Sequence, residues 1–334
     1  MTMRTTLLII GLVLATLAGP ALAAPPKMSE DKDKFVLQND HVSVWFQGKK
    51  PMLKVMPASA PEGAEAVNGF AYTFTSVVEY RDLDANGVVG ANEVVASLDL
   101  HKASAWNVTS ASAPDGAVTL DLRLVAPVKL GKGDLVPEGA PVALPNGTPL
   151  PTRDASIGLV FTIRDAATTI DAGGVNATVP ATSVKYDFVV DSWPFVDAAQ
   201  DRLALVSKVT GALEAQNATG VEGASVAANG TDVGALSWTT IATGNTTKGE
   251  TIDVPVKATM EADAAGETTL TYTYDAADLA TLVHDPTIGV VPTEAALESA
   301  ADTATGALKD VPAPGVALAA VGVAAAALVV GRRR

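Results

Sequence analysis

The 334-residue sequence contains no cysteine, and it has few histidines and aromatic residues. The absence of cysteine excludes disulfide bonds, thiolate metal ligands and cysteine nucleophiles. The three histidines, His41, His101 and His284, stand far apart and form no HxH or HExxH spacing, so no local pattern supports a histidine-based zinc site. The GxSxG motif of serine hydrolases is also missing.

Positively charged residues are fewer than negatively charged ones. Lysine and arginine number 23 against 37 aspartates and glutamates, which gives a formal net charge of −14. This balance argues against nucleic acid and against an anionic membrane surface as partners, because both would repel the chain. It favours cation binding or a soluble external surface.

The N-terminus has the pattern of a secretory signal peptide over residues 1–23. Arg4 supplies the positive start, Leu7–Leu17 is nearly all apolar, and Ala21-Leu22-Ala23 fits the small-x-small cleavage pattern. The alternative, a first transmembrane helix, needs a longer apolar run. We expect residues 24–34 to form a disordered linker after cleavage.

The C-terminus carries a second apolar segment over residues 311–331, followed by three arginines at 332–334. Together with its flanks, this segment is long enough to be a transmembrane or sorting helix. The arginines should stay cytoplasmic, which would leave the preceding chain outside the cell membrane. The alternative is a buried, alanine-rich helix of the globular region.

This ending resembles the archaeal PGF-CTERM sorting tails, which have a Pro-Gly-Phe motif, an apolar helix and a terminal basic cluster. The matching residues are Pro314, Gly315 and Val316, with valine in place of the family's phenylalanine, then the apolar run and the arginines. The resemblance implies an archaeal surface protein whose tail is processed and linked to lipid. Residues 284–310, which contain the breakers Asp285-Pro286 and Val291-Pro292, are expected to be a stalk.

Residues 35–283 show the period-two alternation of apolar and polar side chains that half-buried strands require. Examples are Val118–Leu124, Ser183–Val190 and Leu270–Tyr274. This pattern predicts an all-β, antiparallel β-sandwich. The proline-rich stretch 127–155 is expected to be a long loop between two sandwich halves, 35–126 and 156–283. Trp106 and Trp238 each stand at the same distance before a strand-like stretch. This repetition would fit a duplication, although chance explains it nearly as well.

One motif has recognisable chemistry. Residues 82–93 fit the twelve-residue calcium loop D-x-[DN]-x-[DN]-G-x5-E. They resemble the loops of EF-hands and dockerins, but the flanking sequences read as strands. The predicted ligands are the side chains of four residues and one carbonyl group: Asp82, Asp84, Asn86, Glu93 and the carbonyl of Val88. Gly87 permits the sharp turn, and Val89 is the apolar anchor. The alternative is an Asn-Gly turn with solvated acids.

Six Asn-x-Thr sequons predict a glycosylated outer surface: Asn107, Asn146, Asn176, Asn217, Asn229 and Asn245. Alternatively, threonine-rich strands and turns produce these sequons without modification. The aromatic cluster Trp193-Pro194-Phe195 is either a core plug or the floor of a carbohydrate-binding cleft.

Taken together, the patterns predict an exported, membrane-anchored cell-surface protein with a calcium-stabilised loop and a structural, adhesive or ligand-binding role. Its partners would be the membrane, through the C-terminal helix, and glycans or other envelope proteins. The alternative is a secreted carbohydrate-active hydrolase or a carbohydrate-binding module. A hydrolase would use two carboxylates, but no local motif selects a pair.

Overall fold

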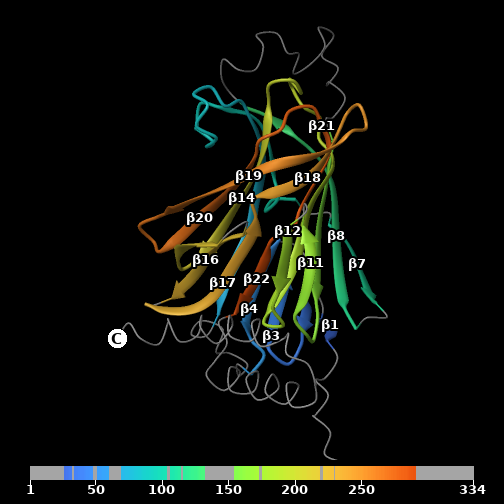
Figure 1. Cartoon of the computed structure of the whole chain (residues 1–334), viewed down its shortest axis with the longest axis vertical. Helices are drawn as coiled ribbons and strands as arrows, with labels where there is room; N and C mark the ends of the chain where they lie inside the picture. The colour runs from blue at the N-terminus through green and yellow to red at the C-terminus, as the bar shows by residue number, and fades with distance from the viewer. Residues whose placement is uncertain are drawn as a thin grey trace, which may run out of the picture. The chain divides into compact units, whose positions relative to one another are not determined.

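The regular secondary structure of the described residues consists of β-strands. The computed structural model describes residues 26–290, apart from 32–33, 48–50, 60–68, 104–105, 114–115, 132–153, 173–174, 219–220 and 229. Within these residues every regular element is a β-strand, which confirms the all-β prediction (Figure 1). The strands are β1 (Lys27–Asp31), β2 (Lys34–Gln38), β3 (Val42–Gln47), β4 (Met52–Pro57), β5 (Phe70–Tyr80), β6 (Val94–Asp99), β7 (Asn107–Ser112), β8 (Val118–Pro127), β9 (Lys129–Leu130), β10 (Asp154–Ile163), β11 (Thr168–Ala172), β12 (Val175–Val179), β13 (Ser183–Ser192), β14 (Arg202–Thr210), β15 (Ala212–Ala218), β16 (Val221–Ala228), β17 (Thr231–Thr239), β18 (Ile241–Thr246), β19 (Thr251–Ala262), β20 (Glu267–Tyr274), β21 (Leu279–His284) and β22 (Thr287–Val290).

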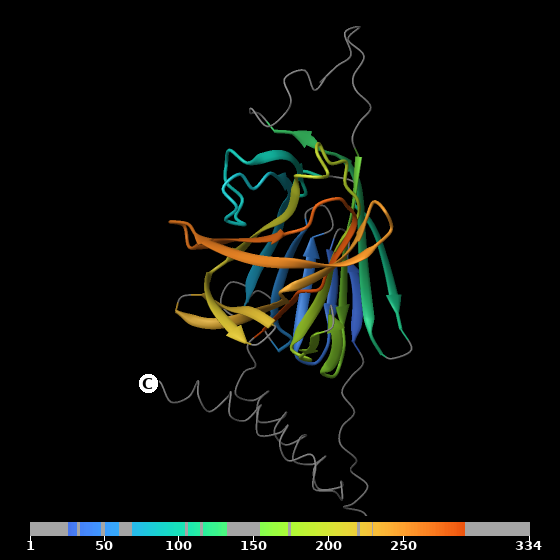
Figure 2. The same ribbon diagram turned by 45° about the horizontal axis from the view of Figure 1, so that its top comes forward.

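These strands form two layers. In the first layer β1, β2, β3, β4, β5, β14, β20 and β19 pair in that order, and β6 takes the place of β4 beside the second half of β5. In the second layer β7, β8, β10 and β13 are followed by β21 and β22, which continue to β18 and β17 (Figure 2). Each of these pairings is antiparallel, as the alternation predicts.

Strand β19 belongs to both layers. Its first residues, 251–255, pair with β18 in the second layer, and residues 256–262 pair with β20 in the first. Pro255 stands at the change of partner, where its missing N–H costs no ladder bond. The neighbouring amide of Val256 donates to the carbonyl of Thr240 at 2.8 Å. The two layers are therefore joined by a continuous, hydrogen-bonded strand.

The core between the layers is built by the inward face of each strand. Phe161 of β10 lies at its centre, with ring centroids 5.4 Å from Phe46, 6.1 Å from Phe74 and 6.0 Å from Tyr186. Tilted and edge-on aromatic contacts of this kind add to the stabilisation that burial provides. Most of the chain's few aromatic residues are buried in the core.

Several polar side chains inside the core are hydrogen-bonded to one another or to the backbone. All five tyrosines are buried, and the hydroxyls of Tyr72 and Tyr186 lie 3.1 Å apart. His284 is fully buried, with Nδ1 3.1 Å from the hydroxyl of Tyr274 and Nε2 3.4 Å from the carbonyl of Thr239. Desolvation lowers the pKa of His284 to about 4, so the ring is neutral and donates one N–H.

The body of the protein extends further at both ends than the sequence predicts. Lys27–Asp31, which lies within the expected linker 24–34, forms β1 and pairs along its whole length with β2. At the other end, the expected stalk 284–310 contains β22, whose residues are all buried between β13 and β17. Pro286 interrupts the strand without ending the sheet, because Thr287–Val290 pairs with both β13 and β17.

Strands from the two predicted halves, 35–126 and 156–283, pair with each other. Strand β8 from the first half pairs with β10 from the second over ten residues, and β5 pairs with β14. The described residues accordingly make up one unit. The ends of the predicted loop 127–155 are strand residues, since β9 occupies Lys129–Leu130 and β10 starts at Asp154.

Several predicted segments fall outside the described residues: the signal peptide 1–23, the C-terminal helix 311–331 and the stalk beyond residue 290. Among the residues that the structure does describe, none forms a helix with the length and apolarity needed to span a membrane.

The position of Phe161 allows a test of the core. Replacing Phe161 with alanine should lower the free energy of unfolding by about 3–5 kcal/mol, because three aromatic neighbours lose their partner and a cavity remains. Thr162→Ala, on the outward face of the same strand, should change it by less than about 0.5 kcal/mol. Denaturant unfolding measures both values, and equal losses for the two variants would contradict the assigned facing.

Candidate metal site

The acidic loop joins two neighbouring strands of the first layer. Strand β5 ends at Tyr80, β6 begins at Val94, and these two residues face each other across the ladder. The amide of Arg81 donates to the carbonyl of Glu93 at 2.9 Å, which closes the loop at its base. The prediction that strands flank this loop is confirmed, so the loop has no helices on either side.

Three of the predicted ligands are brought together. One carboxylate oxygen from each of Asp82, Asp84 and Glu93 lies within 4.8 Å of the others. Backbone amides hold these carboxylates in place: Gly87 donates to Asp82 Oδ2 at 3.0 Å. Glu93 accepts from Leu83 at 2.9 Å and from Gly90 at 2.7 Å, so the last acid of the loop is tied to both of its halves.

The other two predicted ligands lie on the same turn. The side-chain amide of Asn86 donates to Asp84 Oδ2 at 2.7 Å, and its oxygen accepts from the amide of Val88 at 2.6 Å. These bonds place Asn86 beside the acids and set the direction of the backbone at Val88. The carbonyl of Val88 stays a predicted ligand.

Two glycines make the loop geometrically possible. Gly87 has a φ of 67°, in the left-handed region that glycine occupies without strain. At Gly90 a Cβ atom would lie 2.8 Å from Glu93 Oε2, closer than real contacts of this kind. A side chain at position 90 would therefore displace the carboxylate that closes the site.

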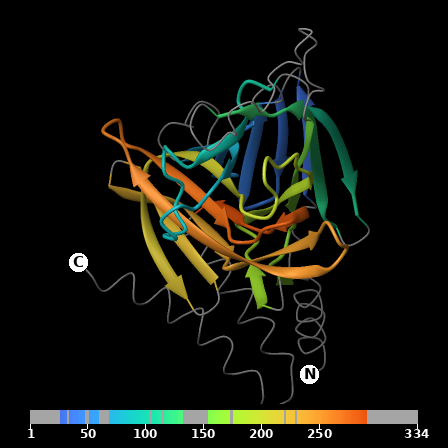
Figure 3. The ribbon, with the colours of Figure 1, turned by 90° about the horizontal axis from the view of Figure 1, so that it is seen from above.

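Contacts from distant strands fix the outer side of the loop. Lys257 of β19 donates from Nζ to the carbonyl of Asn86 at 2.6 Å, and the hydroxyl of Thr273 of β20 donates to the carbonyl of Gly87 at 3.0 Å. Figure 3 shows the loop, in cyan, beside these orange strands. Sequence reasoning missed both residues, because they lie 171 and 186 positions away and belong to no motif.

A small apolar cluster lies beneath the loop on the outer side of the first layer. It consists of Val78, Tyr80 and Ala204, with Val89 packed against it. Val89 thus acts as the apolar anchor that the loop pattern predicts. Because Tyr80 is only 1% exposed, the loop shields a large side chain from water on a face that is otherwise polar.

A buried pair of carboxyl groups lies at the base of the loop. Glu79 accepts from Trp193 Nε1 at 2.9 Å and from the amide of Val196 at 2.6 Å, and it shares a hydrogen bond with Asp201. Asp201 accepts from Arg81 Nε at 2.7 Å. Both acids are 0% exposed. Burial and the neighbouring Asp201 raise the pKa of Glu79 to about 7.

The same contacts decide the role of Trp193. Its side chain is 7% exposed and is part of the core, with the indole nitrogen bound to Glu79. Of the two interpretations of Trp193-Pro194-Phe195, the core plug is correct. A carbohydrate-binding floor at this position is wrong, because no face of the indole is open to a sugar.

The sequons differ in their surroundings. Asn107 is exposed on β7. Asn245 lies on β18, where its amide nitrogen donates to Thr281 at 2.9 Å and its oxygen accepts from Thr251 at 2.8 Å. The backbones of Asn176 and Asn217 belong to β12 and β15. Asn146 and Asn229 lie outside the described residues.

The donor set of the loop fits calcium better than a transition metal. It offers only oxygen atoms, from three carboxylates, one amide and the backbone, and calcium prefers six to eight such ligands. The loop contains no histidine and no cysteine, the ligands that zinc and copper favour. The chain matches no known family model, and no curated protein matches it.

The buried carboxyl pair predicts a pH dependence of stability. Glu79 keeps its proton in the folded state up to about pH 7, whereas in the unfolded chain it loses it near pH 4.5. Its contribution is therefore fully present below about pH 4.5 and is lost as the pH rises through 7. Glu79→Gln removes this titration, so the variant should gain about 1–3 kcal/mol relative to the wild type across that interval.

Chemical denaturation at a series of pH values measures the difference between the two proteins. Glu261→Gln, at an exposed position of β19, is the control for the loss of a carboxyl group, and its effect should be small. A difference between wild type and Glu79→Gln that stays constant from pH 4.5 to 7.5 would contradict the assigned proton.

Proposed function

We propose that the chain is an exported cell-surface β-sandwich protein, anchored at its C-terminus, in which loop 82–93 binds a calcium ion that stabilises the fold. The observation that carries this proposal is the gathering of the Asp82, Asp84 and Glu93 carboxylates on a loop between two paired strands. The proposed role is structural, adhesive or ligand-binding rather than catalytic.

Electrostatics supports the calcium site. Three carboxylates within 4.8 Å of one another repel each other, and the chain as a whole carries a charge of −14. Lys257 reaches the loop, but it donates to a backbone carbonyl on the outer side. A divalent cation among the three acids would remove the repulsion and connect the first residue of the loop to the last.

The position of the site gives the ion its structural effect. Because the loop also contacts β19 and β20 through Lys257 and Thr273, an ion bound by its three acids would fasten β5 and β6 to the strand that joins the two layers. It would also hold Val89 over the apolar cluster on β5 and β14. The residues would bind and orient the ion, and no reaction is proposed.

Export and anchoring are supported by the two terminal segments of the sequence. The apolar run near the N-terminus ends in a small-x-small site, and the apolar run near the C-terminus ends in three arginines. An extracellular location would also provide the calcium concentration that a loop of this kind needs. Localisation of the full chain by surface labelling of intact cells would test this part separately.

Calcium binding is the first expected outcome. Calorimetry on the purified chain should show one site, and calcium at about 100 times the dissociation constant should stabilise the fold by about 2.7 kcal/mol. Asp82→Ala should abolish both the heat and the stabilisation, because Asp82 starts the ligand set and accepts from Gly87.

Asp232→Ala provides the matched control, since this exposed aspartate on β17 lies outside the loop and its loss changes the net charge equally. It should bind calcium like the wild type. If neither the wild type nor the control binds calcium, the loop is an acidic turn and the proposal fails.

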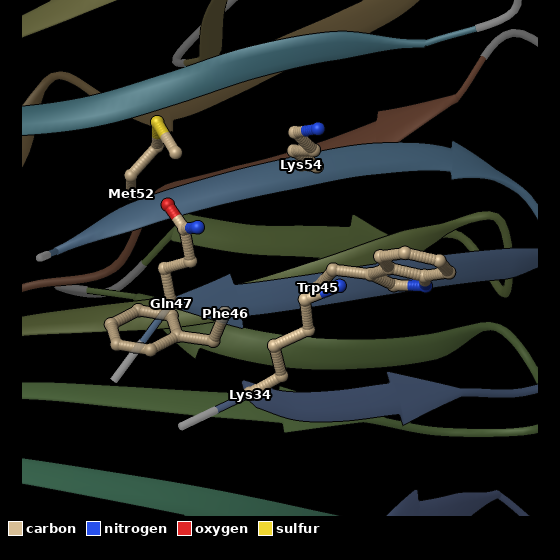
Figure 4. Close-up of a pocket in the computed structure, with 6 residues that line it drawn as sticks. All are labelled: Lys34, Trp45, Phe46, Gln47, Met52 and Lys54. Carbon is tan, nitrogen blue, oxygen red and sulfur yellow. The ribbon is translucent and has the colours of Figure 1, made fainter. Parts of the chain in front are cut away.

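A carbohydrate-binding role is the second candidate, and one surface feature favours it. On the outward face of β3, Trp45 lines a small cavity of about 80 Å³ together with Lys34, Gln47 and Lys54 (Figure 4). Lys34 Nζ lies 5.1 Å from the centroid of the indole ring. An aromatic ring with amide and ammonium donors beside it could bind a sugar that carries a carboxylate.

This candidate has its own expected outcome. Retention on an array of acidic polysaccharides should be lost in Trp45→Ala and kept in Trp193→Phe, because only Trp45 is reachable from outside. Binding that survives Trp45→Ala would exclude this surface. A hydrolase gains no support from the buried pair Glu79 and Asp201, which no substrate can reach.

A further inference from the structure

One margin of the second layer is an open strand edge. Within the described residues β7 pairs with β8 and with no other strand. Figures 1, 2 and 3 all show β7 at the outer margin of the sheet, to the right of β8. Its free side presents backbone N–H and C=O groups to which another extended chain could pair.

Strand β7 lacks the usual protection of such an edge. Exposed edges are commonly protected by charged side chains, proline or a bulge. The sequence of β7 is NVTSAS, without charge or proline, and its six residues pair with β8 in unbroken register. By contrast, the edge strand β1 contains Lys27, Glu30 and Asp31, and β9 is only two residues long.

Instead of a charge, a proline or a bulge, β7 carries a glycosylation sequon. Asn107 and Thr109 are both exposed, and no hydrogen bond from another described residue engages either side chain. Asn107 faces Arg123 across the ladder and Thr109 faces Asp121, so both point to the outer side of the layer. The amide that a glycan would modify is therefore accessible in the folded protein.

The sequon at Asn245 is the opposite case. Strand β18 is paired on both sides, with β19 and β21, so it has no open edge. Both hydrogen-bonding ends of the Asn245 side chain are occupied by Thr251 and Thr281, and Thr247 donates to Asp278 at 2.5 Å. A glycan on Asn245 would break this network, whereas one on Asn107 breaks nothing.

We propose that an N-linked glycan at Asn107 covers the open edge of β7 and prevents a second copy of the chain from pairing with it. The glycan is bulky and hydrated, and it starts from the first residue of the strand. It would exclude a partner strand by volume, as lysine or proline does at other edges. This proposal rests on the export that we propose above, because only an exported chain meets the glycosylating enzymes.

The test uses the full chain, expressed in a host that glycosylates exported proteins and purified in detergent. Mass spectrometry of peptides should find a glycan on Asn107. Size-exclusion chromatography with light scattering should find monomers for the wild type. Asn107→Gln and Thr109→Ala both remove the sequon, and each should lose the glycan mass and shift from monomer to dimer or larger species.

Two further variants separate an edge effect from a loss of folding. Asn107→Lys also lacks the glycan but places a charge on the edge, so it should return to the monomer. Thr281→Val, which removes the partner of Asn245 and no sequon, should stay monomeric with its glycan on Asn107 intact. Circular dichroism should show the same β content for all variants.

The outcomes are distinguishable. If other sequons carry glycans and Asn107 does not, or if Asn107→Gln and Thr109→Ala remain monomeric, the proposal is overturned while export stands. If no sequon is modified and the chain stays inside the cell, both this proposal and the proposed export are overturned. Association that Asn107→Lys fails to reverse would also overturn it, because the edge would not be the contact.

Discussion

The structure depends on a single strand that is hydrogen-bonded in both layers. β19 leaves β18 at Pro255 and continues beside β20, so the two layers share a covalent and hydrogen-bonded connection. The aromatic core around Phe161 fills the space between the layers. In a chain without cysteine, this crossing takes the place of a cross-link, because it fixes the layers through pairing and packing alone.

The candidate metal loop depends on the same crossing. Lys257 lies two residues beyond Pro255 on β19, and Thr273 lies opposite Lys257 on β20. Both donate to carbonyl groups of the loop, so neither hydrogen bond uses the carboxylates of Asp82, Asp84 and Glu93. The loop is thus held by donors from β19 and β20 and by its own backbone amides. An ion would complete the arrangement.

Much of the fold and of the loop could be predicted from the sequence, because both rest on local patterns. Period-two alternation identified the strand Ser183–Val190 and the inward positions of Val184, Tyr186 and Phe188, all of which are buried. The loop motif identified three acids that do gather. These signals are local, since a strand face or a metal loop is encoded within a dozen residues.

What sequence reasoning missed depends on contacts between distant residues. β1 and β22 are short, and only their pairing with β2 and β13 makes them strands. Lys257 and Thr273 are unremarkable in the sequence and gain their role from position. Trp193 could be placed on the surface or in the core until its hydrogen bond to the buried Glu79 showed which is right. No local pattern contains such information.

An ion in the loop would stabilise the strands that the loop contacts. Hydrogen exchange of the full chain, followed by mass spectrometry with and without calcium, tests it most directly. The account predicts slower exchange in two separate regions on adding calcium, residues 82–93 and the paired strands β19 and β20, with no change in β7 and β8. Unchanged exchange in the loop, or slowing spread evenly over the chain, would contradict it.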